Sequence, residues 1–175
     1  KDVYEANYFY AGNNPFRFAA RNVGADQNSL RVATIDQGAD VTLTLDGALT
    51  TSTVGTQVQT ASASPNGAKS GYIFAYDGSS NKVSLITSDT WIATDVIENG
   101  VTDLNVTAKS NWYDEQEVYA ASGTKPALKW TSIAPRPGTS PYVSARGGAN
   151  DEMHVVVYDA TGEITGAPNT VVEKF

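Results

Sequence analysis

Two short apolar runs joined by four turn residues constrain the fold of this 175-residue chain more than any other feature. The runs cover residues 71–77 and 82–87, and the letters between them are GSSN. Strand-forming runs joined by so few turn residues predict an antiparallel β-hairpin. Because side chains alternate along a strand, one face of the first strand is expected to carry its aromatic residues: Tyr72, Phe74 and Tyr76, opposite Ile73 and Ala75.

The rest of the chain has the same β character. Residues 41–45 alternate strictly between apolar residues and threonine, which is typical of a half-buried strand. Thr, Val, Ser and Tyr are frequent, and Gly, Pro, Asn and Asp interrupt the apolar runs throughout. Further strands are expected at 30–35, 128–133 and 153–158, with a return strand at 163–165, and short helices at 16–20 and 110–119, the latter capped by Ser110. The expected fold class is α+β and β-rich: a two-layer β-sandwich-like domain with one or two short helices.

Length and composition exclude several classes of protein. We expect a single domain over residues 1–175, with a variable insertion near 50–127. The absence of cysteine excludes disulfides, thiol nucleophiles and cysteine-ligated metals. The net charge of −7, with scattered Lys and Arg, argues against nucleic-acid binding. No apolar run approaches the length of a membrane helix, so no membrane insertion is expected. The start at Lys1 and the end at Phe175 suggest an internal fragment of a longer chain.

The sequence contains few candidates for a metal or catalytic site. His154 is the only histidine and would share a strand face with Glu152, but it has no second histidine to complete a zinc site or an elbow motif to support a triad. Asp77, Ser79 and Asn81 mimic the start of a calcium loop, yet the glycine and glutamate that such a loop needs are missing. A hairpin turn uses the same residues.

Two further motifs are equally incomplete. Asp159, Thr161 and Gly162 resemble an aspartic-protease triplet, but Ala160 interrupts it and no second copy exists, so a turn is expected. Residues 66–70 end in a Lys-Ser pair without the glycines of a phosphate loop. The prediction is therefore no catalytic, cofactor-binding or metal-binding residue, no cofactor and no enzymatic activity. The acidic residues after Ser110 are expected on the solvated face of a helix: Asp114, Glu115 and Glu117.

Arginine and aromatic residues leave two alternatives open. Arg136 and Arg146 flank a proline-rich loop, where they either form ion pairs with an acidic neighbour or remain solvated. The aromatic residues are expected mainly to pack in the core, although exposed rings can also bind sugars. These residues are Tyr4, Tyr8, Phe9, Tyr10, Phe16, Trp91, Trp112 and Trp130.

Three stretches give the chain a family resemblance. They are YFYAGNNPFRFAARN at 8–22 with LRVATIDQGAD at 30–40, WTSIAPRPGTSPYVSAR at 130–146, and NDEMHVVVYDATGEITG at 150–166 followed by TVVEKF. In wording and order they resemble the tail sheath protein of contractile-tailed bacteriophages, in particular of phages that infect marine cyanobacteria. The resemblance lies toward both ends of the chain, and residues 50–127 correspond to its variable part.

The resemblance implies a structural role. Sheath subunits surround a tail tube and contract to drive it through the host envelope, so the implied partners are neighbouring sheath subunits and the tube. The implied location is the virion tail, assembled in the host cytoplasm. By this resemblance the chain is expected to lack the extended arms by which such subunits link, so the isolated fragment is expected to be a monomer.

Two other functions remain as alternatives. The Thr, Gly, Asn and Tyr content also suits a carbohydrate-binding or adhesin-like β-sandwich, which would show exposed aromatic rings near a shallow groove. A hydrolase would instead need a pocket with converging carboxylates.

Overall fold

The computed structural model describes residues 24–62, 64–123 and 125–175, and the chain divides into two compact units. One unit, called here the sheet unit, comprises Lys1–Thr34 and His154–Phe175. The other, the barrel unit, comprises Ile35–Met153 and is therefore inserted in the middle of the first. This division was not expected from the sequence, which predicts one domain with a variable insertion near residues 50–127.

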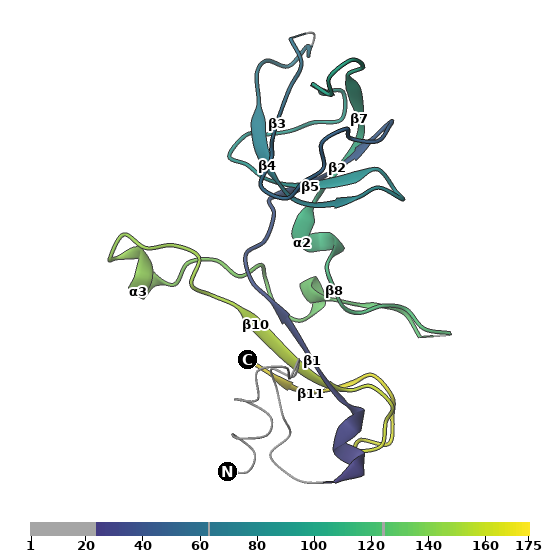
Figure 1. Cartoon of the computed structure of the whole chain (residues 1–175). Coiled ribbons are helices and arrows are strands. Elements are labelled where there is room, and N and C mark those ends of the chain that lie inside the picture. The colour runs from purple at the N-terminus through teal and green to yellow at the C-terminus, as the bar shows by residue number, and fades with distance from the viewer. Residues whose placement is uncertain (1–23, 63, 124) are drawn as a thin grey trace, which may run out of the picture. The chain divides into compact units, whose positions relative to one another are not determined.

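Six antiparallel strands form the main sheet of the barrel unit (Figure 1). Their order in the sheet is β3-β4-β5-β2-β7-β6, and a bridge between Thr60 and Ile97 joins the end of β3 to β6. The sheet thus closes on itself, which removes most of its open edges. The strands are β2 (Val41–Leu45), β3 (Gln57–Gln59), β4 (Ser70–Asp77), β5 (Lys82–Ile86), β6 (Val96–Ile97) and β7 (Leu104–Asn111).

The interior of the barrel is filled by aliphatic side chains from alternate strand positions. Leu43 and Leu45 point inward from β2 as the alternation predicts, and Val41 packs against the same cluster. Trp91, only 1% exposed, adds the largest side chain. The remaining members of the buried cluster are Leu49, Val58, Ile73, Val83, Leu85, Ile97, Leu104 and Val106.

The predicted hairpin is confirmed as β4 and β5, but the predicted faces of β4 are wrong. A bulge at Phe74 interrupts the register, because Ile73 pairs with Leu85 whereas Ala75 pairs with Ser84. The extra residue reverses the alternation. Tyr76 therefore packs against the core, while Tyr72 stays 53% exposed. The ring of Phe74 instead meets Trp112 edge to face, at 5.5 Å between ring centroids.

The helix predicted over 110–119 is wrong in its bounds. Strand β7 continues through Ser110, which lies opposite Thr42, and only α2 (Trp112–Glu115) is helical. Asn111, not Ser110, caps α2, because its side chain accepts a hydrogen bond from the Tyr113 amide. The chain then becomes extended at Gln116 and enters strand β8 (Glu117–Tyr119).

The strand predicted over 128–133 is also too long. It comprises β9 (Leu128–Lys129), paired with β8, and is followed by the 3₁₀ helix η3 (Trp130–Ser132). The Trp130 side chain is 2% exposed, and its main-chain amide donates to the Gln116 carbonyl. The proline-rich loop then leads to α3 (Pro141–Ser144), where proline occupies the first turn and Ser140 is the cap.

The described part of the sheet unit begins with the 3₁₀ helix η2 (Ala25–Ser29) and strand β1 (Leu30–Ile35). Strand β10 (His154–Asp159) lies between β1 and β11 (Thr170–Lys174). The predicted strands at 30–35 and 153–158 are thus confirmed to within a residue, whereas the return strand expected at 163–165 is wrong. The Asp159 carboxylate accepts hydrogen bonds from the main-chain amides of Gly162, Ile164 and Thr165, which hold this segment in a loop. The chain therefore pairs with β10 only from Thr170 onward.

The predicted fold class is confirmed: the described residues are α+β and β-rich, with two short α-helices and a six-stranded sheet that forms a near-barrel. The helix predicted at 16–20 lies outside the described residues.

Truncation of a core side chain tests the register of the hairpin. Leu85 is fully buried and Ile86, the next residue, is 47% exposed. We expect Leu85→Ala to lower the free energy of unfolding by about 2–5 kcal/mol, because the lost side chain leaves a cavity. Ile86→Ala is the matched control and is expected to cost much less. Urea denaturation followed by circular dichroism measures both, and equal losses would contradict the register.

Candidate functional site

The most organised polar region of the barrel unit follows the line where the barrel closes. We call this line the seam: strand β3 meets β6 through the Thr60–Ile97 bridge. On either side of that bridge, the Ala61 amide donates to the Val96 carbonyl at 2.8 Å and the Glu98 amide donates to the Gln59 carbonyl at 3.0 Å. These few bonds hold the first and last strands together. A buried ion pair lies at one end of the seam and a polar groove at the other.

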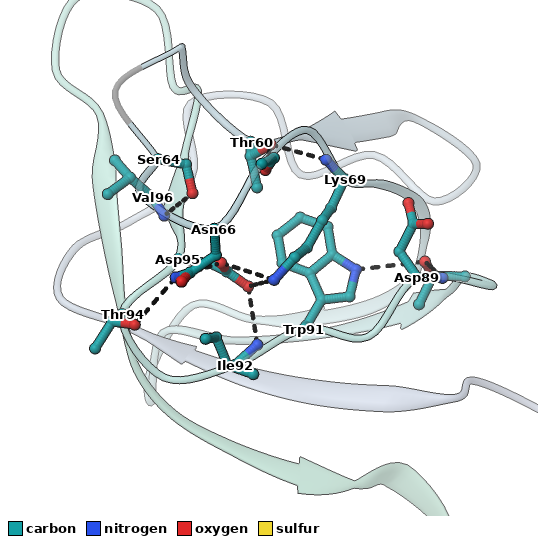
Figure 2. Close-up of polar contacts among 12 residues, drawn as sticks. Thr60, Ser64, Asn66, Lys69, Asp89, Trp91, Ile92, Thr94, Asp95 and Val96 are labelled. Carbon is teal, nitrogen blue, oxygen red and sulfur yellow. Dashed lines mark hydrogen bonds and ion pairs between the residues drawn. The ribbon is translucent and has the colours of Figure 1, made fainter.

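The ion pair joins Lys69 and Asp95 (Figure 2). The Lys69 Nζ lies 2.7 Å and 2.9 Å from the two carboxylate oxygens, and the Asp95 side chain is fully buried. The carboxylate also accepts from the Ile92 main-chain amide at 2.8 Å and from the Asn66 Nδ2 at 3.2 Å. Burying two opposite charges is favourable only when their hydrogen-bonding capacity is met, and here the carboxylate has a full set of donors.

The same contacts determine the protonation state of Asp95. Burial raises the pKa of the carboxyl, but the hydrogen bonds from Lys69, Ile92 and Asn66 and the charge of Lys69 outweigh it, so the pKa lies below its ordinary value of 3.8. Asp95 is therefore ionised at neutral pH. A carboxylate that is ionised at neutral pH and saturated with hydrogen bonds serves as a structural anchor: it fixes the loop that carries Asn66 against the start of β6.

The groove begins where β6 ends. It has a volume of about 410 Å³ and is open to solvent. Two apolar side chains, Leu49 and Val58, lie at its base and are 9% and 5% exposed. The other lining residues are polar or small, and they come from three separate segments: Thr50, Thr51, Thr56, Gln57, Gln59, Glu98, Asn99 and Gly100.

Some of the polar groups of the groove are already paired. The Asn99 Oδ1 accepts from the Thr50 amide at 2.8 Å and from the Thr50 hydroxyl at 3.0 Å. Gln59 donates from its Nε2 to the Glu98 carboxylate. Glu98 is the one carboxylate among the lining residues, whereas hydrolysis of a glycosidic bond typically uses two. The groove is thus equipped to form hydrogen bonds but lacks that acid–base pair.

The structure does not bring the predicted metal-site residues together. Strand β10 starts at His154, so Glu152 does not share a strand face with it. The Glu152 carboxylate instead accepts from the Gly138 amide at 2.9 Å. Across the described ranges no group of three or more His, Asp or Glu side chains is placed to hold a metal ion.

The two aspartate motifs are turns. Asp77 closes the β4–β5 turn by accepting from the Ser79 amide and from the Ser79 and Ser80 hydroxyls. These bonds, that of Ser80 foremost, lower the pKa of Asp77 to about 2. Asp159, fully buried, closes the β10–β11 loop. Burial raises its pKa, but hydrogen bonds from Thr165, Ser29 and Gly162 outweigh that effect and hold the pKa well below the usual range.

The Lys-Ser pair of the incomplete phosphate loop also has a structural use, because Lys69 is the cation of the buried pair. Glu115 does not lie on a free helix face: it accepts hydrogen bonds from the Lys82 ammonium and the Ser110 hydroxyl. Lys69 and Glu115 thus both form ion pairs within the barrel unit, and a structural role accounts for the sequence motifs that contain them.

Arg136 pairs within the barrel unit rather than remaining solvated. Its guanidinium donates to the Ala39 carbonyl at 2.8 Å and to the Asp40 carboxylate at 3.1 Å. Arg146 stacks over the Tyr142 ring, with its guanidinium carbon 3.6 Å from the ring centroid. The three tryptophans are buried, as core packing predicts. The early aromatic cluster, Tyr4 to Phe16, lies outside the described residues.

Sequence reasoning missed both the ion pair and the groove. Asp95 carried a usable signal, because an aspartate inside the apolar stretch WIATDVI must find a partner if that stretch is buried. The groove carried none, since its lining comes from segments that only the closure of the barrel brings together.

Comparisons with protein-family models, with curated proteins and with solved structures found no match to this chain. In the part of the chain that the structure describes, no helix is long and apolar enough to cross a membrane.

Removal of the charge on Asp95 tests the importance of the ion pair. Asp95→Asn leaves Lys69 buried without its counter-ion, so we expect the free energy of unfolding to fall by about 3–5 kcal/mol. The control is Lys82→Met, which breaks the half-exposed pair with Glu115 and is expected to cost about 1 kcal/mol or less. The double variant Lys69→Met/Asp95→Leu is expected to be more stable than Asp95→Asn. Chemical denaturation measures the free energy of unfolding of each variant. Equal losses for Asp95→Asn and Lys82→Met would contradict the stabilising role of the buried ion pair.

The ion pair also predicts a pH dependence. Because the pKa of Asp95 is lowered in the folded state, its contribution to stability is present above the unfolded value of 3.8 and is lost as the pH falls through the folded value. The difference in unfolding free energy between the wild type and Asp95→Asn should therefore be constant near neutral pH and shrink below 3.8. The other carboxylates titrate in both proteins, so the difference isolates Asp95. A difference that does not shrink would contradict the lowered pKa.

Proposed function

We propose that this chain is a structural module of a contractile phage tail sheath. The observation that carries the proposal is the way the barrel unit is inserted: it interrupts the chain between β1 and β10, which are neighbouring strands of the same sheet. A closed barrel joined to another sheet by two chain segments suits a domain that decorates a subunit. The resemblance of residues 8–22, 30–40, 130–146 and 150–166 to sheath proteins supports the same function.

The physical character of the barrel fits a part that moves as a rigid body. Contraction of an assembly proceeds by rotation and translation of packed domains between two arrangements. A domain that moves in this way must keep its own fold. The barrel has its own apolar core, a closed seam and a saturated buried ion pair, so its stability depends on contacts within the barrel.

The sheet unit offers an edge by which subunits join. Among the described residues, β11 pairs only with β10, and we assign its outer edge to a strand from a neighbouring subunit. The amide and carbonyl of Phe175 form hydrogen bonds with the carbonyl and amide of Val155, and Val157 pairs with Glu173. Because hydrogen-bonding direction alternates along a strand, the amide of Lys174 faces outward.

Assembly of the protein expressed from its complete reading frame tests the function. We expect tubes or stacked rings by negative-stain electron microscopy, and a monomer of 18.5 kDa for the isolated chain by size-exclusion chromatography with light scattering. A peptide tag inserted between Ser79 and Ser80, in the β4–β5 turn, should be labelled along the outside of the tubes. Failure to form any ordered assembly would argue against a sheath.

A matched pair of substitutions tests the edge of β11. Lys174→Pro removes the outward amide without touching the bonds to β10, so it should abolish assembly while the isolated chain stays folded. Lys174→Ala keeps the amide and should assemble normally. Tubes formed equally by both variants would show that β11 does not accept a strand, without bearing on the sheath function itself.

A further inference from the structure

We propose that the groove at the end of the seam binds a neutral saccharide. This site is independent of the assembly role proposed above, and it concerns the barrel unit alone. The proposal rests on four properties of the groove: its size, its unpaired hydrogen-bonding groups, the absence of cationic side chains in its lining, and an exposed aromatic ring beside it.

The size and the lining suit one or two sugar rings. Small-molecule sites typically have volumes of about 300–1,000 Å³, and the groove has about 410 Å³. Leu49 and Val58 provide an apolar base, whereas threonine, glutamine and asparagine side chains form its walls. A pyranose has the matching pattern, because its C–H faces are apolar and its hydroxyl groups radiate from the ring edge.

Several polar groups in the groove have no partner within the described residues. The side chains of Thr51, Thr56 and Gln57 make no hydrogen bond there, although they line the groove. The main chain of Gln57 contributes as well. The Thr56 carbonyl accepts from the Ile73 amide of β4, and the Thr60 amide donates to the Lys69 carbonyl just before β4. The Gln59 carbonyl faces the opposite way and accepts from the Glu98 amide. Because hydrogen-bonding direction alternates along an antiparallel strand, the main-chain amide and carbonyl of Gln57 also face away from β4. Strand β6 has already ended at this level, so it does not bond them.

The charge of the lining excludes anionic ligands. No lysine or arginine lines the groove, so phosphate and sulfate groups find no cation there. The single carboxylate, Glu98, already accepts a hydrogen bond from Gln59. It remains able to accept further hydrogen bonds from sugar hydroxyls, because a carboxylate has about four acceptor positions. The favoured ligand is therefore rich in hydroxyl groups and uncharged.

An aromatic ring stands beside the polar wall. Tyr72 on β4 lies directly opposite Gln57 on β3, and its side chain is 53% exposed. Directly opposite residues on neighbouring strands project from the same face of a sheet. The ring thus shares a sheet face with Gln57, where an amphipathic aromatic side chain can cover a sugar that extends from the groove past Gln57. The bulge at Phe74 matters here, because Tyr72, before the bulge, stays outside while Tyr76, after it, turns toward the core.

The test is titration of the ¹⁵N-labelled chain with maltotriose and with N,N′-diacetylchitobiose, followed by amide chemical shifts. Ligand is added to about 10 mM, which covers dissociation constants in the millimolar range. We expect saturable shifts for at least one of the two, centred on residues 49–51, 56–59 and 98–100. No saturable shift in these segments with either saccharide would overturn the proposal.

Variants with matched controls locate the site. Gln57→Ala and Tyr72→Ala should each weaken binding by about five-fold or more, since each removes a direct contact. Gln37→Ala and Tyr142→Ala change the same residue types outside the groove and should leave the affinity unchanged. Retention of the wild-type spectrum elsewhere shows that each variant is folded. Equal effects of the groove variants and their controls would overturn the assignment.

An uncharged peptide in extended conformation is the competing ligand, because it would also use the outward main chain of Gln57. A tetrapeptide of alternating Ala and Thr with blocked ends is titrated in parallel. Binding of this peptide with higher affinity than either saccharide would overturn the saccharide assignment and identify the groove as a strand-accepting edge. These outcomes leave the assembly experiments unaffected, so failure of this proposal is distinguishable from failure of the sheath function.

Discussion

Closure of the barrel at the seam is the constraint on which the rest of the barrel unit depends. Strand β6 has only two residues, so the described backbone forms two hydrogen bonds across the seam, from the Ala61 amide to Val96 and from the Glu98 amide to Gln59. The Lys69–Asp95 pair reinforces them from within. Because a buried carboxylate is tolerated only with its full set of donors, the pair specifies the position of the loop from Asn66 to Lys69 relative to the start of β6.

Local patterns predicted the individual strands well, because a strand with one buried face must alternate. The run at 41–45 and the hairpin around GSSN are clear cases. Deviations arose where tertiary contacts outweighed local preference. Ser110 looked like a helix cap, but pairing with Thr42 holds it in β7. Nothing in the sequence near Phe74 marks the bulge. The ring of Phe74 packs edge to face against Trp112, a residue 38 positions away in a different element.

The candidate site was only partly predictable, for a related reason. Turn motifs are local, so Asp77 and Asp159 could be recognised as turn residues from their neighbours alone. The insertion of the barrel and the groove at its seam are products of long-range pairing. Gln57 and Asn99 are far apart in the sequence, and only the Thr60–Ile97 bridge brings their segments to opposite sides of one groove.

The groove and the buried pair are two consequences of the same short strand. A longer β6 would continue to pair with β3 past Gln59 and would bond the outward main chain of Gln57, which would close the seam and fill the groove. The chain instead leaves the sheet at Asn99 and Gly100, whose φ of 75° is a conformation that glycine adopts readily. The seam is therefore unpaired at the groove, and the Lys69–Asp95 pair stabilises it at its other end. The barrel thus combines a rigid, internally satisfied end with an end whose polar groups remain available to a ligand.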